Sequence, residues 1–151
     1  MVTVPPIPRL KGDTLEFMQR LWNVAHALEV ASKRMARTLG VTGPQRLVLR
    51  IIGLHPTITA QAIASTLGMH PSTLTGVLAR LERRKLIARV WDPSDRRRAR
   101  FRLTPAGKRV DGERKGTVEA AVRRALVRAD GDVRATLATL DVLAQELVRE
   151  E

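Results

Sequence analysis

The sequence predicts a mainly α-helical fold with a small β-hairpin wing: a winged helix-turn-helix placed between long terminal helices. Three observations support this prediction. Apolar residues recur at helical spacing over most of the 151 residues. Near the middle of the chain, two short helical patterns are separated by only a few residues. An alternating, arginine-rich hairpin pattern follows them.

The first part of the chain predicts an arm and two helices. Residues 1–12 contain three prolines and are expected to form a flexible arm. Apolar residues then follow helical spacing from Leu15 until Gly40, which predicts one long helix. Pro44 fits the first turn of a second helix, and Gly53 is expected to end it.

The helix-turn-helix is predicted from cap residues and from one apolar stripe. Thr59 is a suitable N-cap for a helix over 60–67, and Gly68 a suitable left-handed exit from it. Pro71 then starts a helix over 71–84. The apolar residues of this second helix lie at core-facing spacing: Leu74, Val77, Leu78 and Leu81.

A hairpin and two further helices complete the expected fold. Strands are predicted over 86–91 and 99–103, joined by the turn residues Asp-Pro-Ser-Asp at 92–95. A helix is expected from 104 to 130, and a last one is striped with apolar residues over 133–148.

The charge of the chain is concentrated in its middle. The formal net charge is +12. Residues 1–29 hold three bases and three acids, and residues 103–151 hold nine of each. Residues 30–79 hold five bases and no acid, and residues 80–102 hold ten bases and three acids. A merely solvated surface would not confine the excess in this way, so a polyanionic partner is predicted.

Composition excludes several other classes. The chain has no cysteine, which removes disulfides, thiolate metal sites and cysteine-based oxidant sensing, and favours a reducing cytoplasm. The N-terminus lacks the features of a signal peptide, and the long uncharged stretch 51–79 is too polar to span a membrane. With 3% aromatic residues and no Tyr, a stacking platform for single strands is also disfavoured.

The face of the 71–84 helix opposite its core stripe predicts contact with a DNA major groove. A glycine inside a helix costs about 1 kcal/mol relative to alanine, but small residues let the backbone approach base edges closely. Hydroxyls there can bond bases or phosphates, although capping and plain exposure are their common structural roles. The residues of this face are Ser72, Thr73, Thr75, Gly76, Ala79, Arg80 and Arg83.

The hairpin tip over 92–98 adds a second contact. A small basic loop fits the minor groove, where an arginine is attracted by the negative potential of narrow A·T-rich segments. Asp95 is unusual among so many bases. We expect its carboxylate to hold a neighbouring arginine, Arg97, in a fixed pose.

Three segments together resemble the winged-helix signature of the MarR family of bacterial transcription regulators: LERRKLIAR at 81–89, DPSDRRR at 92–98 and LTPAG at 103–107. The resemblance implies a homodimer joined through residues 13–40 and 104–151, with residues 41–103 binding a palindromic double-stranded operator. It also implies that Arg97 enters the minor groove, that the protein acts as a repressor, and that a small-molecule effector releases it.

Two positions depart from the family pattern. His70 precedes Pro71 where Ser, Thr or Asp is the usual cap, and we expect it to cap or face solvent. Lys85 replaces the glycine that commonly ends the helix, so either the helix ends without a positive φ or Lys85 is kept for a phosphate. The DNA-contacting residues predicted in total are Ser72, Thr73, Thr75, Gly76, Arg80, Lys85, Asp95, Arg96, Arg97 and Arg98.

Effector, metal and enzyme sites are weakly marked. By resemblance, Trp22, His26 and Arg50 are candidates to line an effector cleft, although simple core packing is the favoured role of Trp22. His26 and Glu29 are spaced to hold a metal, but such a pair is usually ordinary surface. No catalytic motif or cofactor-binding loop is present in the sequence, so neither a metal, a cofactor nor an enzymatic activity is expected.

A sequence-neutral packaging protein or an RNA-associated basic protein remains the alternative. Both would share the salt-sensitive affinity of a regulator. A two-fold regulator predicts a palindromic site with half-sites about 10 bp apart and a mismatch penalty of about 1 to 3 kcal/mol per base pair. A packaging protein predicts neither.

Overall fold

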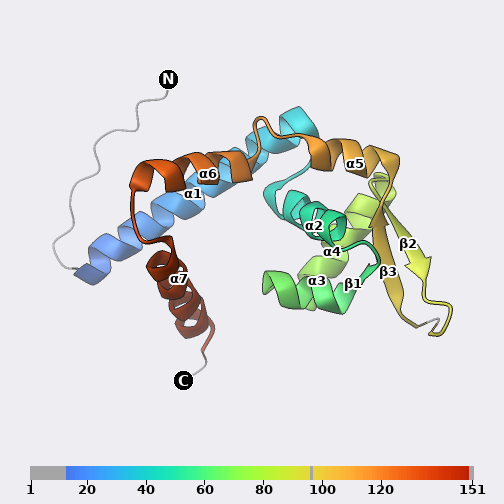
Figure 1. The fold of residues 1–151 in the computed structure, drawn as a ribbon. Coiled ribbons are helices and arrows are strands. Elements are labelled where there is room, and N and C mark those ends of the chain that lie inside the picture. Colours follow the sequence, from blue (N-terminus) through green and yellow to red (C-terminus); the bar gives the residue numbers. More distant parts are fainter. Residues whose placement is uncertain (1–12, 96, 150–151) are drawn as a thin grey trace. The chain divides into compact units, whose positions relative to one another are not determined.

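The computed structural model describes residues 13–95 and 97–149, so the predicted arm over 1–12 lies outside the described residues. By contacts the chain divides into two compact units, one up to Arg114 and one from Lys115. The elements of Figure 1 are α1 (Asp13–Leu39), α2 (Gly43–Leu54), β1 (Ile58–Thr59), α3 (Ala60–Leu67), α4 (Pro71–Arg83), β2 (Ile87–Trp91), β3 (Ala99–Leu103), α5 (Pro105–Gly112), α6 (Val118–Ala129) and α7 (Val133–Val148).

The first unit is a winged helix-turn-helix, as predicted. Helices α3 and α4 form the helix-turn-helix, and α2 packs against α1, α4, α5 and β3. Strands β2 and β3 form the wing, and β1 adds a third antiparallel strand, so that the order in the sheet is β1-β3-β2. The two-residue β1 was not predicted, because a pairing this short leaves no alternation in the sequence.

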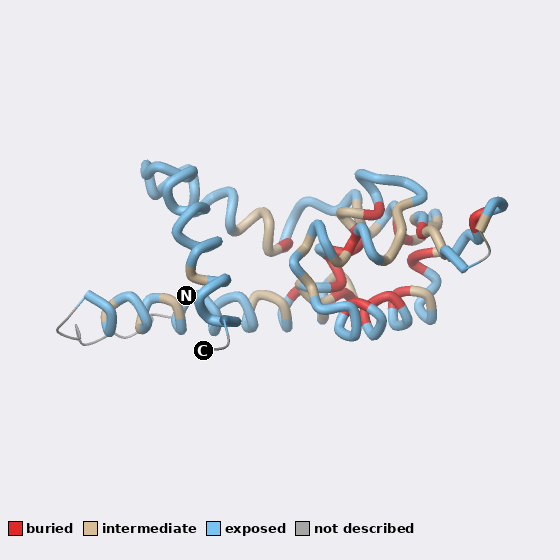
Figure 2. The backbone as a smooth tube through the Cα atoms, turned by 90° about the horizontal axis from the view of Figure 1, so that it is seen from below, coloured by how far each residue is buried: buried red, intermediate tan, exposed pale blue. Residues whose placement is uncertain are grey.

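The core lies among α2, α3, α4, α5 and the sheet. Figure 2 shows the buried residues in red along this part of the chain. All four predicted core residues of α4 are buried, and burial of each such side chain stabilises the fold by about 1.5 to 3 kcal/mol. Among the described residues, the largest apolar side chains that are fully buried include Met35, Leu49, Ile52, Ile63 and Phe101.

The caps that define α3 are confirmed. The side chain of Thr59 accepts a hydrogen bond from the backbone N–H of Ala62 at 3.2 Å. Gly68 ends the helix with φ 57°, in the left-handed region that glycine adopts without a steric penalty. The helix therefore has the bounds that its sequence signals predict.

Gly53 does not end α2, contrary to the prediction. The helix continues to Leu54. A Cβ at Gly53 would lie 2.8 Å from Oδ2 of Asp111 in α5. The glycine therefore serves the close approach of α5 to α2, and its role in packing cannot be told from a helix stop in sequence alone.

The single helix predicted over 104–130 is in fact two helices. α5 ends at Gly112, and α6 begins after Thr117, whose side chain accepts a hydrogen bond from the backbone N–H of Ala120 at 3.2 Å. Gly116 has φ 70° between the two helices. The break thus follows from a glycine turn and a new N-cap that the apolar periodicity conceals.

The terminal helices bury little apolar surface within one chain. Among the described residues of α1 only Met35 is buried, and α6 and α7 have no buried residue. None of the described helices has the length and apolarity that a membrane span requires. The exposed large apolar residues of the three helices are Leu15, Phe17, Met18, Trp22, Val24, Leu28, Val30, Val122, Leu126, Val127, Val133, Leu137, Leu140, Val142, Leu147 and Val148.

Candidate nucleic-acid interface

The predicted contact face of α4 is open to solvent. Every predicted residue of this face, from Ser72 to Arg83, is exposed, whereas the apolar stripe on the opposite side is buried. A Cβ at Gly76 would meet no atom within 4 Å. Packing within the chain therefore does not require a glycine here, and the missing side chain leaves room for another molecule to approach the helix backbone.

His70 is the N-cap of α4, as expected. Its Nδ1 accepts a hydrogen bond from the backbone N–H of Ser72 at 3.3 Å and lies 2.7 Å from the Ser72 hydroxyl oxygen. The hydroxyl of Thr75 donates to the carbonyl oxygen of Pro71 at 2.9 Å. The first turn of the helix is thus fixed locally, while the hydroxyl of Thr73 remains exposed.

Lys85 adopts the left-handed conformation with φ 55°. Of the two alternatives considered above, the helix therefore ends with a positive φ. The backbone N–H of Lys85 bonds the carbonyl oxygen of Glu82 at 2.8 Å, and that of Leu86 bonds the carbonyl oxygen of Leu81 at 3.0 Å. These two bonds are the Schellman pattern of a glycine-ended helix. A lysine in this conformation costs about 1 kcal/mol, which its exposed ammonium could offset by binding a phosphate.

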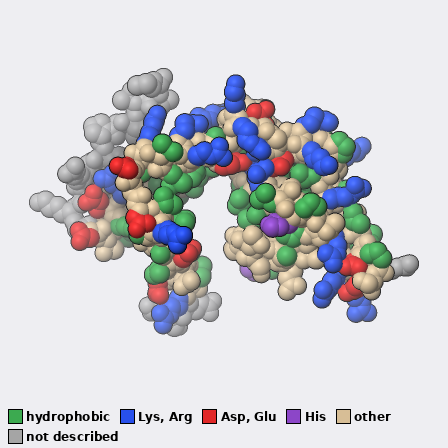
Figure 3. Space-filling model, in the orientation of Figure 1, with side chains coloured by type: hydrophobic (Ala, Val, Ile, Leu, Met, Phe, Trp, Pro, Cys, Tyr) green, Lys and Arg blue, Asp and Glu red, His purple; other side chains and the backbone are tan. Residues whose placement is uncertain are grey.

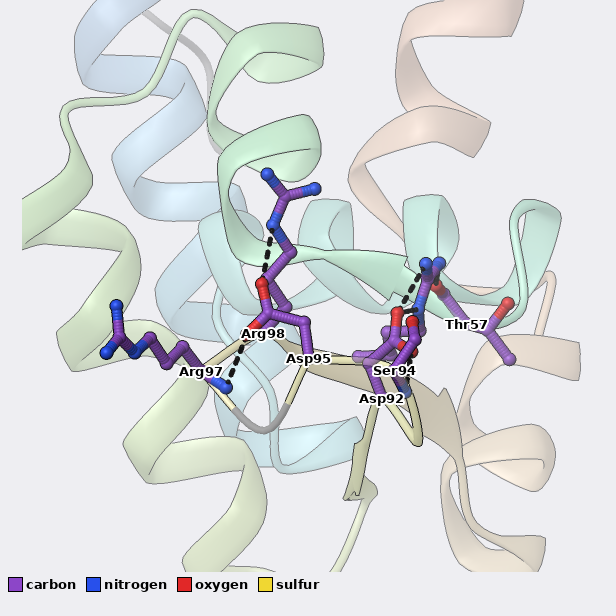
Figure 4. A network of polar contacts seen from close by, with 7 residues as sticks. Thr57, Asp92, Ser94, Asp95, Arg97 and Arg98 are labelled. Atoms are coloured by element: carbon purple, nitrogen blue, oxygen red, sulfur yellow. Dashed lines mark hydrogen bonds and ion pairs between the residues drawn. The ribbon is translucent and has the colours of Figure 1, made fainter.

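The base of the wing turn is held by Asp92, a predicted turn residue whose pairing with Arg100 the sequence did not indicate (Figure 4). The Asp92 carboxylate accepts a hydrogen bond from the Ser94 hydroxyl at 2.6 Å and two from Arg100, at 2.9 and 3.0 Å. Arg100 also donates to the carbonyl oxygen of Thr57 at 3.1 Å. Hydrogen bonds from Ser94, and then from Arg100, hold the pKa of Asp92 well below its ordinary value.

Asp95 does not hold the side chain of Arg97, contrary to expectation. Its Oδ1 accepts from the backbone N–H of Arg97 at 3.0 Å, and its Oδ2 lies 3.5 Å from Nε of Arg98. In Figure 4 the guanidinium of Arg97 points away from this carboxylate. The physical reason is local: the carboxylate accepts from the backbone N–H two residues on, in an Asx turn, instead of from the guanidinium of that residue. Arg96 lies outside the described residues.

Glu82 and Arg89 form a third pair, between α4 and β2, that sequence reasoning missed. Arg89 donates from Nε and from Nη2 to the two carboxylate oxygens of Glu82, each at 3.0 Å. Its guanidinium carbon lies 5.3 Å from the ring centre of Phe101 and 5.7 Å from that of Trp91. The hydrogen bond to Glu82 raises the pKa of Arg89. Glu82 and Arg89 are seven residues apart, in a helix and in a strand, and no sequence pattern predicts a pairing across such a turn.

The three acids of residues 80–102 thus divide the arginines of this region into two groups. Glu82, Asp92 and Asp95 each pair with one arginine. Within the described part of the chain, no ion pair is formed by the exposed cations Arg80, Arg83, Arg84, Lys85, Arg97 and Arg102. Figure 3 shows blue basic side chains gathered around the wing, with red acidic ones among them.

A cavity of about 340 Å³ lies between the contact face and the wing. Thr75 lines it from α4, and Arg89, Arg97 and Arg98 line it from the wing side. Arg89 is paired with Glu82 and Arg98 with Asp95, so Arg97 is the lining cation left to attract an anion such as a phosphate.

The candidate effector residues lie on two helices, Trp22 and His26 in α1 and Arg50 in α2. Trp22 is 63% exposed in the single chain, so its side chain does not pack into the core of one chain. His26 is also exposed. Arg50 donates to Oδ1 of Asp111 at 2.9 Å, and the described residues include no group of three His, Asp or Glu side chains that could hold a metal.

Arg46 is a further buried arginine that the sequence did not mark. It is 2% exposed and donates from Nη2 to the carbonyl oxygens of Asp111 and Glu113 at 3.1 and 2.8 Å. It also donates from Nη1 to the carbonyl oxygen of Val110. These carbonyls end α5, where a cation is favoured, so Arg46 fixes α5 to α2.

Comparisons with known proteins agree with this fold. The model of the MarR family matches residues 41–99, from two residues after the end of α1 to the first residue of β3. A protein of Thauera aromatica named "Putative transcriptional regulatory protein for hcr operon" is 30% identical over 130 residues, which cover 80% of this chain and 74% of that protein. The chain belongs to the MarR family.

Other proteins are similar to this chain over shorter stretches or in fold. The transcriptional regulator HosA of Escherichia coli O111:H- is 37% identical over 70 residues, covering 46% of this chain and 52% of HosA. The S. aureus MepR–DNA complex has a TM-score of 0.69 at 22% identity, covering 90% of this chain and 97% of that one. PcaV from Streptomyces coelicolor, solved with its natural ligand, has a TM-score of 0.63 at 24% identity, covering 98% and 100%. As a MarR-family protein, this chain is a transcription regulator with a winged helix-turn-helix.

Proposed function

We propose that this MarR-family chain binds double-stranded DNA sequence-specifically as a homodimer and represses transcription. The observation that carries the proposal is the open, small-residue face of α4 beside exposed cations without ion-pair partners. Gly76 leaves room for a close approach, and Thr73 and Arg80 can bond base edges in a major groove. Lys85 is proposed to contact a phosphate at the end of the helix.

The wing is proposed to enter the minor groove with Arg97. Arg97 is exposed and its guanidinium points away from Asp95, while its backbone N–H donates to the Asp95 carboxylate at 3.0 Å. A pre-formed loop loses little conformational entropy on binding. A free arginine on such a loop suits the negative potential of a narrow A·T-rich groove.

The terminal helices are proposed to join two copies. Large apolar side chains on α1, α6 and α7 are exposed in the single chain, and surfaces of this kind mark interfaces between proteins. The charges of residues 1–29 and 103–151 balance, which suits a self-complementary two-fold contact. On this proposal residues 13–40 and 104–151 dimerise, and residues 41–103 bind DNA.

A small-molecule effector is proposed to release the DNA. The PcaV structure with its natural ligand supports this, because that protein shares the fold. An effector can shift binding only by its differential affinity for the two dimer shapes. Trp22, His26 and Arg50 stay candidates to contact it, and the protein is proposed to work in the cytoplasm.

The decisive experiment is selection of bound duplexes from a random pool at near-physiological salt, followed by a second selection with candidate effectors. Enrichment of a palindrome with half-sites about 10 bp apart supports the proposal. Equal recovery of all duplexes would instead support a sequence-neutral packaging protein. Stronger capture of RNA than of duplex DNA would support an RNA-associated protein.

A further inference from the structure

Glu82 lies where two electrostatic effects oppose a carboxylate. It is in the last turn of α4, the end at which the helix dipole favours cations. No other acidic residue occurs between residues 30 and 91, and the surface around it carries exposed arginines. A carboxylate here also repels phosphates, so its presence needs another reason.

The structure supplies that reason in Arg89. Both oxygens of Glu82 are engaged by the guanidinium at 3.0 Å, in the bidentate geometry that fixes direction as well as distance. The side chains are 27% exposed for Glu82 and 41% exposed for Arg89. The pair is therefore partly shielded from solvent. It joins the end of α4 directly to the third residue pair of the wing strands, Arg89 and Phe101.

Two aromatic rings hold Arg89 from the sheet side. Arg89 is the cross-strand partner of Phe101, whose ring is 1% exposed and belongs to the core. Trp91 lies on the same face of β2, two residues further along, and is 55% exposed. Arg89 is thus bound at once by α4, by a core residue of β3 and by the exposed ring of β2.

We propose that Glu82 and Arg89 are a positioning pair that fixes the wing against α4 and so sets the separation between the base-reading face and Arg97. The cavity lined by Thr75, Arg89 and Arg97 is the space whose width this pair determines. The proposal rests on the proposed binding of DNA by α4 and the wing.

Direct contact of Arg89 with DNA is the competing role. The two roles predict different effects of Glu82→Gln on DNA binding. If Arg89 bound a phosphate, Glu82→Gln would free its guanidinium and remove a repelling charge, so binding would strengthen. A positioning pair predicts instead that the contribution of Arg97 falls when Glu82 is changed, because the wing no longer presents Arg97 in one place.

The test measures the loss of operator affinity caused by Arg97→Ala in three backgrounds: the wild type, Glu82→Gln and Arg89→Lys. Arg89→Lys keeps the charge but cannot make the bidentate contact. We expect the loss to fall from about tenfold in the wild type to about twofold in both variants. A loss that stays the same in both variants overturns the proposal. Glu29→Gln, which removes an exposed pair with Lys33 on α1, is the matched control and should leave the loss unchanged.

A readout without DNA separates this proposal from the proposed function. If Arg97→Ala has no effect even in the wild type, the proposed role of the wing in DNA binding is contradicted. A measurement on the protein without DNA then tests whether Glu82 and Arg89 position the wing. In a Trp22→Phe background Trp91 is the one remaining tryptophan. Glu82→Gln should lower its fluorescence anisotropy, because the wing strand loses its tie to α4. Unchanged anisotropy contradicts the positioning role.

Discussion

The backbone of Gly107 lies directly against the carbonyl group of Leu86. A Cβ at position 107 would lie 1.9 Å from the Leu86 carbonyl oxygen and 3.0 Å from its carbon. That carbonyl oxygen also accepts hydrogen bonds from the backbone N–H and the hydroxyl of Thr104. The start of α5 is therefore fixed to the point where the chain leaves α4 for the wing.

Gly107→Ala is expected to destabilise the protein by about 3 kcal/mol, because α5 or the start of the wing must move to admit the methyl group. Chemical denaturation measures this change. Gly112→Ala is the matched control in the same helix, since a Cβ there would meet no atom within 4 Å. Equal effects of the two substitutions would contradict the close contact.

Arg97→Ala is expected to weaken binding about tenfold to duplexes with A·T-rich flanks, and less to G·C-rich ones, because it removes a minor-groove contact. Arg98→Ala is the control, because Arg98 is the next residue and is paired with Asp95, with its Nε 3.5 Å from Oδ2 of that carboxylate. It should weaken binding without a preference for flanking sequence. Fluorescence anisotropy titrations on matched duplexes measure both. Loss of affinity by Arg97→Ala that is equal on both flanks would exclude minor-groove insertion.

Thr73→Ala and Arg80→Ala are each expected to change which operator bases matter, since both side chains lie on the open face of α4. Loss of one good base contact costs about 1 to 3 kcal/mol of discrimination at that base pair. Repeated selection from a random pool measures the change. An identical consensus from both variants and the wild type would show that this face does not read bases.

Leu140→Asp is expected to yield monomers with weak affinity for DNA, because it places a charge in the apolar stripe of α7, where Leu140 is 46% exposed in the single chain. Sedimentation and operator titration measure the two effects. Gln145→Asp introduces the same charge at an exposed polar position of the helix and should keep the dimer. A Leu140→Asp protein that remains dimeric would contradict the role of this stripe.

Asp92 is expected to make the stability of the wing depend on acid pH. Its pKa is lowered in the folded protein, so its stabilising contribution is complete above its ordinary pKa near 3.8 and is lost as pH falls below that value. The unfolding midpoint of the wild type should therefore fall more steeply below about pH 4 than that of Asp92→Asn. Parallel curves for the two proteins would show that the carboxylate is not held as described.

Much of the fold follows from local signals in the sequence. The bounds of α3 come from one hydroxyl cap and one glycine, and the core stripe of α4 from its spacing. Each of these signals acts within a few residues, so the surrounding structure does not change it. The positive net charge of the middle region likewise needs no coordinates to be seen.

The remaining features depend on pairings that the sequence does not encode locally. Arg89 could have been assigned to DNA as readily as to Glu82, and the carboxylate of Asp95 had two arginines within reach. From the sequence alone Gly53 is interpreted as the end of a helix, whereas the structure places the side chain of Asp111 beside it. In each case a partner distant along the chain, or the direction of one side chain, decides the role.

The spacing of the operator half-sites tests most directly whether two copies of α4 read DNA together. Once a palindrome has been selected, about 5 bp are inserted at its centre, which turns one half-site to the opposite side of the duplex. A two-fold dimer predicts that affinity falls with this insertion to that of a duplex carrying only one half-site, because the two recognition helices can no longer bind both half-sites at once. Affinity that is unchanged by the 5 bp insertion would contradict it.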